Sequence, residues 1–264
     1  MIPRKAFWEG RLALGLVSLP VRLYPAAESK QVRFHFLHHK CLTPLEYERY
    51  CPHCRIDVRW EEVARGFEFE KGKFVPLSAE DFARLPLKTA RTIEILSFVD
   101  AREVDSLFFE KSYWVVPHSA GLEAYRLLAE ALTRLGKFAL AKVVIRHKEH
   151  LALLRPLEGA LVLVTLHYSD EIHKPSEFPE LRKEAKPSPE ELELALELLR
   201  SLSSSFSPEH HHDEYRRKLL ELLKAKAEGR ELLPLVQEKL KQPLELVEAL
   251  RASLLLAKRK HRKK

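Results

Sequence analysis

Apolar and polar residues alternate along most of the first two thirds of the chain, which is the pattern of half-buried β-strands. The segment from Phe7 to Pro25 predicts two strands punctuated by glycine and proline, and the segment GFEFEKGKFVPL predicts a hairpin that turns at Lys71-Gly72-Lys73. Further strands are predicted at 92–100, 138–146, 150–156 and 160–168. Many strands around few helices indicate a β-barrel core.

Four segments carry helical signals instead. Ser119 to Leu135 places leucines on one face and ends at Gly136, and a short helix is predicted from Ser78 to Leu85. Ser188-Pro189-Glu190-Glu191 has an N-cap residue, a proline at the first helical position and an acid at the third. We expect the leucine stripe of this helix to cover either the barrel or a second subunit. A further helix is predicted at 213–228.

Composition changes divide the chain into three parts. Residues 169–187 are rich in charge and proline, as in a connector. We therefore expect a mixed β/α core at 1–187 with an extended arm at about 30–62, a helical arm at 188–230, and a small amphipathic helical appendage with a basic tail at 231–264. The histidines His210, His211 and His212 are expected in a surface loop, because three adjacent imidazoles cannot easily share one metal ion.

The formal charge of +7 is concentrated at the C-terminus, where six of the last seven residues are Lys or Arg. Such a tail favours a polyanionic partner, although cations are also common at the solvated end of a helix. The chain has no Asn and is rich in Leu, Arg, Glu and Pro, which favours a thermophilic source. No apolar run is long enough for a membrane span and no signal peptide is visible, so we expect a cytoplasmic protein.

All three cysteines lie between Val32 and Trp60, in the order H-x2-C-x9-C-x2-C. Zinc prefers thiolate and imidazole ligands at such spacings, so His38, Cys41, Cys51 and Cys54 predict a structural zinc site. His39 or His53 are alternatives to His38, and unligated cysteines would act as small buried apolar residues. A catalytic zinc with water as fourth ligand has little support, because no glutamate follows a metal-protease pattern.

The same segment interleaves basic and aromatic residues, which is typical of nucleic-acid binding. No phosphate-binding loop, dinucleotide motif or nucleophile elbow is present, so we expect no enzyme activity.

Several motifs in one order resemble the prokaryotic Ku proteins. They are W-x-G-x-L-x-x-G-L-V-S-x-P-V-R-L-Y at Trp8–Tyr24, F-H-x-L-H at Phe34–His38, R-G-F-E-F-E-K-G-K-F-V at Arg65–Val75, F-F-E-K-S-Y-W-V-V-P at Phe108–Pro117, G-K-x-A-x-A-K at Gly136–Lys142 and E-H-L-A-x-L-R-P at Glu149–Pro156. The resemblance implies a ring-shaped homodimer on a β-barrel, with an arm that bridges over double-stranded DNA ends. It also implies a nucleoid-associated protein with a role in non-homologous end joining and an ATP-dependent DNA ligase as partner.

Candidate DNA contacts form three sets of basic residues. The arm contributes Arg33, Lys40, Arg49, Arg55 and Arg59, the barrel contributes Lys111, Lys137, Lys142, Arg146, Lys148 and Arg155, and the tail contributes Lys258, Arg259, Lys260, Arg262, Lys263 and Lys264. Each single residue could equally be an ordinary solvated charge. An alternative function is a zinc-ribbon module that binds single strands or a protein partner without ring threading.

Overall fold

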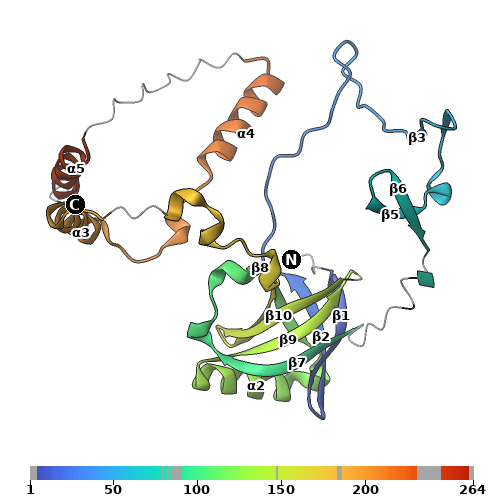
Figure 1. Ribbon diagram of the computed structural model, residues 1–264, viewed down its shortest axis with the longest axis horizontal. Helices are drawn as coiled ribbons and strands as arrows, with labels where there is room; N and C mark the ends of the chain where they lie inside the picture. The colour runs from blue at the N-terminus through green and yellow to red at the C-terminus, as the bar shows by residue number, and fades with distance from the viewer. Residues whose placement is uncertain are drawn as a thin grey trace. The chain divides into compact units, whose positions relative to one another are not determined.

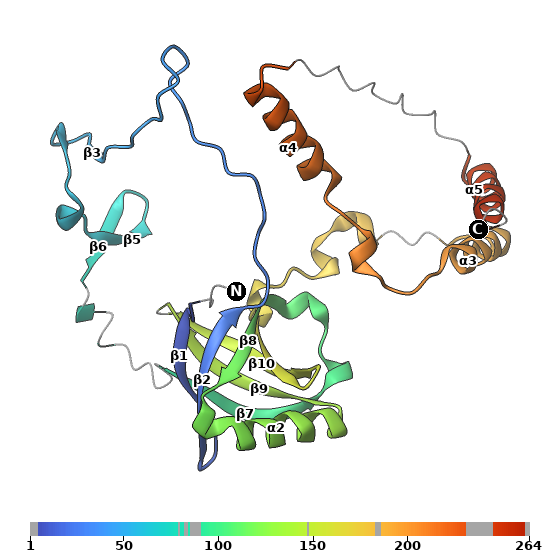
Figure 2. The same ribbon diagram turned by 180° about the vertical axis from the view of Figure 1, so that it is seen from behind.

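The computed structural model describes residues 5–78, 80–81, 84, 91–146, 148–182, 186–230 and 245–261 (Figures 1 and 2). The chain divides into two compact units, Met1–His173 and Lys174–Lys264. The connector predicted at 169–187 spans this division.

Seven strands of the first unit close into a barrel in the order β1-β2-β8-β11-β10-β9-β7 (Figure 1). Their bounds are Trp8–Leu14 (β1), Val17–Pro25 (β2), Thr92–Asp100 (β7), Phe109–Pro117 (β8), Lys137–Ile145 (β9), Lys148–Leu157 (β10) and Ala160–Leu166 (β11). Neighbouring strands are antiparallel except β1 and β7, whose parallel pairing closes the barrel. The predicted mixed β/α barrel is confirmed.

Alternate residues of each strand fill the interior of the barrel. In β9 the inward residues are Ala139, Ala141, Val143 and Ile145, all buried. Because side chains alternate between the two faces of a strand, the residues between them, Leu140, Lys142 and Val144, lie on the outer face of the barrel.

The helix α2, Leu122–Leu135, covers the end of the barrel where β8 finishes and β9 begins. The Tyr125 hydroxyl donates to the carbonyl of Val115 at 2.7 Å and accepts from the amide of Leu161 at 2.7 Å. One phenol thereby joins the helix to two strands. Gly136 ends the helix with a left-handed φ of 60°, as its sequence predicts.

The long excursion between β2 and β7 includes the segment predicted as an arm at about 30–62, and we call its described residues 27–78 the arm. It contains two small hairpins, β3 (Tyr50–Cys51) with β4 (Ile56–Asp57), and β5 (Arg65–Glu70) with β6 (Lys73–Leu77). The second is the predicted hairpin, with Gly72 in its turn at a φ of 78°. No residue from 27 to 78 is buried.

The helix predicted at Ser78–Leu85 falls largely outside the described residues. Its capping interaction is present, since Ser78 Oγ accepts from the amide of Asp81 and the Asp81 carboxylate accepts from the amide of Ser78.

The second unit contains the helices α3 (Pro189–Leu202), α4 (Glu214–Ala227) and α5 (Leu246–His261). The predicted Ser188 cap is confirmed, with its hydroxyl accepting from the amide of Glu191. Asp213 caps α4 in the same way. The first part of the predicted appendage, residues 231–244, lies outside the described residues.

The sequence did not identify α5 as a neighbour of α3. The two helices pack together, and Arg251 pairs with Glu190 and Lys258 with Glu197, both at 2.8 Å. The predicted leucine stripe of α3 remains largely exposed, with Leu199 at 64%.

Short 3-10 turns connect these elements, at Trp60–Glu62, Ala101–Glu103, Ser106–Phe108, Ser119–Gly121, Ser169–Glu171, Pro175–Glu177, Pro179–Arg182 and Pro208–His210. His210, His211 and His212 are exposed, as predicted. In the part of the chain that the structure describes, no helix has both the length and the apolar character to cross a lipid bilayer.

Candidate nucleic-acid interface

The first predicted metal-binding pair lies in a tight loop of the arm. Leu37 and Pro44 form an isolated antiparallel bridge, and the amide of His38 donates to the carbonyl of Thr43 at 2.9 Å. His38 Nδ1 lies 3.0 Å from Cys41 Sγ. Leu42, directly after the cysteine, has a left-handed φ of 56° that turns the chain back.

The second pair repeats this construction. Cys51 pairs with Ile56 in the β3–β4 hairpin, and the amide of Arg55 donates to the carbonyl of Cys51 at 2.8 Å. Arg55, directly after Cys54, has a φ of 57°. Both H-x2-C and C-x2-C thus form a short β-bridge, a turn and a left-handed residue after the last ligand.

Local hydrogen bonds shift the titration of the three thiols. Bonds to Thr43 and then His38 lower the pKa of Cys41 to about 7. The amides of Cys54 and His53 lower the pKa of Cys51, whereas the neighbouring Cys51 thiol raises the pKa of Cys54. Of the two thiols in the C-x2-C turn, Cys51 is therefore the one that ionises more readily.

The structure brings the four predicted ligands together as two pairs and not as one cluster. Among the described residues, no group of three or more His, Cys, Asp or Glu side chains converges on a metal position. None of the cysteines is buried, which disfavours the alternative of small buried apolar residues. The donor set of three thiols and one imidazole fits the preferences of zinc.

All five arm cations are exposed to solvent: Arg33, Lys40, Arg49, Arg55 and Arg59. The guanidinium of Arg49 lies 4.5 Å from the centre of the Trp60 ring. Trp60 is itself 65% exposed. Cation and aromatic ring are therefore presented on one surface, as in sites that bind nucleic-acid backbones and bases.

The six predicted barrel cations fall into three groups. Lys137 lies 3.6 Å from Asp100, and Lys142 lies 2.8 Å from Glu149, whose hydrogen bond raises the pKa of the lysine. Arg155 has a buried Nε with no hydrogen-bond partner among the described residues. The remaining three, Lys111, Arg146 and Lys148, line one cavity.

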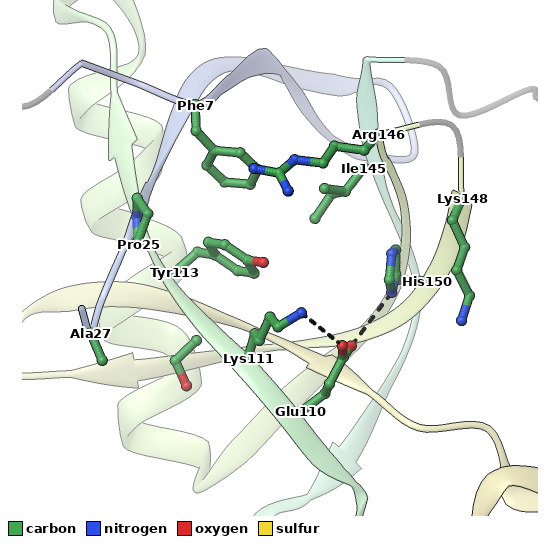
Figure 3. A pocket seen from close by; sticks show the side chains of 11 residues that line it. Phe7, Pro25, Ala27, Glu110, Lys111, Tyr113, Ile145, Arg146, Lys148 and His150 are labelled. Atoms are coloured by element: carbon green, nitrogen blue, oxygen red, sulfur yellow. Dashed lines mark ion pairs between the residues drawn. The ribbon is translucent and has the colours of Figure 1, made fainter. Parts of the chain in front are cut away.

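That cavity is the mouth of the barrel at the end opposite α2 (Figure 3). It has a volume of about 680 Å³. Its lining is Phe7, Pro25, Ala27, Glu110, Lys111, Ser112, Tyr113, Ile145, Arg146, Lys148 and His150. We call this cavity the barrel mouth.

Glu110 organises the polar side of the barrel mouth. Its carboxylate accepts from Thr165 Oγ1 at 3.0 Å and lies 3.2 Å from Lys111 Nζ and 3.7 Å from His150 Nδ1 (Figure 3). Burial opposes ionisation, but the bonds from Lys111 and Thr165 lower the pKa of Glu110 overall. Burial lowers the pKa of His150 and raises that of Tyr113.

Sequence reasoning missed Phe7, Glu110, Tyr113 and His150 as members of a site. A signal was present, because Lys111 and Tyr113 on β8, like Lys148 and His150 on β10, stand at alternate, inward positions.

The basic tail is only partly described. Lys258 is engaged by Glu197 on α3, and Arg259 and Lys260 lie in α5. Arg262, Lys263 and Lys264 lie outside the described residues.

Comparison with known proteins gives the family of the chain. Residues 13–194 match the family model of the Ku70/Ku80 beta-barrel domain. Proteins named "Non-homologous end joining protein Ku" are similar over most of the chain. The one from Symbiobacterium thermophilum is 42% identical over 95% of this chain and 62% of its own length. The one from Archaeoglobus fulgidus is 36% identical over 95% of this chain and 98% of its own length. The Bacillus subtilis protein is 34% identical over 99% of this chain and 85% of its own length. With its closed barrel, its inserted arm and these matches, the chain belongs to the Ku family.

Proposed function

We propose that two copies of this chain form a ring that threads onto double-stranded DNA ends irrespective of sequence, protects and bridges them, and acts in non-homologous end joining. Membership of the Ku family carries the proposal. The relatives' shared name supplies the pathway, and the barrel with its inserted arm supplies the parts of a ring.

The physical logic is topological. A ring that contacts sugar and phosphate reads no base edges, so it ignores sequence, and a duplex can enter a closed ring only where the duplex ends. The exposed arm cations supply donors for phosphates. No bond is made or broken in this role, so the protein needs no catalytic residues.

The arm requires a second source of order, because it buries no side chain of its own from residue 27 to 78. We propose that His38, Cys41, Cys51 and Cys54 hold a structural zinc ion. Bound zinc would fix the two ligand loops to each other, which supplies folding energy that the arm lacks.

Dimerisation and ligase recruitment belong to the same proposal. The exposed aromatic residues of the arm, such as Phe67 at 63% and Phe74 at 61% in its β5–β6 hairpin, are available for a second copy. We assign recruitment of an ATP-dependent DNA ligase to the second unit, whose α3 keeps an exposed leucine stripe.

A second candidate is a zinc-ribbon arm that binds single strands. The Arg49–Trp60 pair favours it, because cations over exposed aromatic rings also suit unpaired bases. It predicts stronger binding to single strands than to duplex.

One experiment separates the two. A gel-shift assay at moderate salt compares a linear duplex, the same duplex as a covalently closed circle, and its single strand. Threading predicts stable complexes on the linear duplex alone. Equal retention on the circle would exclude threading, and preference for the single strand would favour the second candidate.

A further inference from the structure

The barrel mouth differs chemically from the opposite end of the barrel. At the opposite end α2 covers the interior with Tyr125, Ala129 and Leu132. At the mouth, inward positions carry charged and aromatic side chains, and the described residues that line it come from strands and their ends (Figure 3). Mouths of β-barrels are common places for ligand sites.

One side of the barrel mouth is aromatic. The rings of Phe7 and Tyr113 stack with centroids 4.9 Å apart and an angle of 23° between their planes. Both rings line the cavity. The Tyr113 hydroxyl is protonated at neutral pH, as in any tyrosine, and can donate a hydrogen bond; burial raises its pKa further.

The other side is cationic. Lys111, Arg146 and Lys148 line the cavity, and Glu110 is the one carboxylate among its lining residues. Lys111 pairs with Glu110, and Lys148 lies 3.4 Å from Glu171. Arg146 has no carboxylate within ion-pair distance among the described residues, and Figure 3 shows its side chain reaching into the opening.

This combination selects a class of ligand. A stacked aromatic pair offers a surface for a planar base, and an uncommitted guanidinium offers paired donors to a phosphate. A cavity of about 680 Å³ falls in the range of small-molecule sites.

We propose that the barrel mouth binds a nucleoside 5′-phosphate, with the base against Phe7 and Tyr113 and the phosphate on Arg146 and Lys111. This proposal rests on the proposed function, and the bound nucleoside phosphate is then the unpaired, 5′-phosphorylated nucleotide of a DNA overhang. Paired bases inside a duplex are stacked on both faces, and a terminal pair is held in place by its partner strand. An unpaired overhang nucleotide, in contrast, is free to turn both its base and its 5′-phosphate into one cavity.

The test measures affinity for two linear duplexes that differ only at the end, one blunt and one with a three-nucleotide 5′-phosphorylated overhang. We expect the wild-type protein to bind the overhang roughly tenfold more tightly, as one stacked base and one charged contact allow. Arg146→Gln should bring the ratio of the two affinities close to one. Arg134→Gln, the matched control on exposed α2 at the opposite end, should retain the ratio.

Phe7→Leu tests the aromatic side separately. Leucine keeps an apolar side chain in the core contact but removes the ring, so the ratio should fall while the affinity for the blunt duplex stays unchanged. A melting curve for each variant checks that the barrel is folded.

A titration with deoxyadenosine 5′-monophosphate, followed by NMR, separates this proposal from the threading of duplexes. Binding that Arg146→Gln abolishes supports the site even if the protein fails to distinguish linear from circular DNA. If the mononucleotide binds but the overhang brings no gain, the nucleoside phosphate site stands and its source is free nucleotide. A wild-type ratio of one without mononucleotide binding, or a ratio that survives Arg146→Gln, overturns the proposal.

Discussion

The barrel and the arm both contain large apolar side chains, but the barrel buries them and the arm exposes them. In the barrel, leucines such as Leu163 are completely buried and the backbone is paired on both sides. In the arm, Phe36 is 72% exposed and Tyr47 is 78% exposed, and the pairing is limited to short hairpins. The barrel is therefore stabilised by its own core, whereas the arm has no core of its own, and we propose that a bound zinc ion and a second chain stabilise it.

Removal of the proposed zinc should give the largest difference between the two regions. Because the binding energy of a structural zinc is folding energy, Cys51→Ser or a strong chelator should unfold the arm while leaving the melting of the barrel unchanged. Limited trypsin digestion should then cut at Arg49, Arg55 or Arg59 roughly tenfold faster or more.

Ser18→Ala, in the barrel hairpin, is a suitable control for protease susceptibility. The prediction is contradicted if metal analysis of the purified protein finds no zinc, or if the melting temperature of the barrel falls when the arm unfolds.

Truncation of apolar side chains should affect the two regions unequally. Leu163→Ala removes a fully buried side chain and should lower the free energy of unfolding by about 2–5 kcal/mol. Phe36→Ala removes a larger but exposed side chain and should change it by less than about 0.5 kcal/mol. Urea unfolding followed by circular dichroism measures both, and similar losses would mean that Phe36 is covered in solution.

Removal of one hydroxyl sharpens the same contrast. Tyr125→Phe leaves the carbonyl of Val115 and the amide of Leu161 without their buried partner, which should cost about 1–3 kcal/mol. Tyr50→Phe in the arm is the matched control and should be neutral, since Tyr50 is 57% exposed. A neutral Tyr125→Phe would show that α2 does not depend on this phenol.

Arm cations should act on DNA binding and not on stability. Loss of one phosphate contact lowers the slope of log affinity against log salt concentration by about 0.9. Arg49→Gln and Arg59→Gln should each reduce the slope by up to that amount, whereas Arg134→Gln on α2 should not. Affinities measured across a salt series decide this, and an unchanged slope for the double variant would remove these residues from the interface.

Lowering the pH should reduce the stability of the barrel slightly, because His150 in the barrel mouth is held neutral in the folded state. Burial lowers the pKa of His150, so the folded state holds the imidazole neutral although Glu110 faces it. Its contribution to stability is present above the unfolded pKa of about 6.5 and is lost as the pH falls from there through the folded pKa.

The pKa of Glu110 is lowered instead, so its contribution is lost only at more acid pH. Melting temperatures between pH 7.5 and 5 should therefore fall for the wild-type protein, and less for His150→Gln. Parallel curves would show that another group is responsible.

The sequence predicted those elements that depend on neighbouring residues, namely strands and helix ends. Alternation predicted the strands of the barrel, and the Ser188 and Gly136 signals located the ends of helices. The barrel mouth was missed because Lys111 and His150 come together only through β11, which pairs with both of their strands. Strand order is a property of the whole fold, and so are the pairing of Lys142 with Glu149 and the packing of α5 on α3.

The proposal that a ring of two copies encloses DNA can be tested by closing the DNA after loading. The protein is bound to a linear duplex, the ends are ligated into a circle, and the circle is washed at about 1 M salt, where charge attraction is screened within roughly 3 Å. An enclosing ring should remain on the circle through the wash and leave after a single double-strand cut. Protein that washes off the intact circle, or that stays on the cut duplex at the same salt, would contradict it.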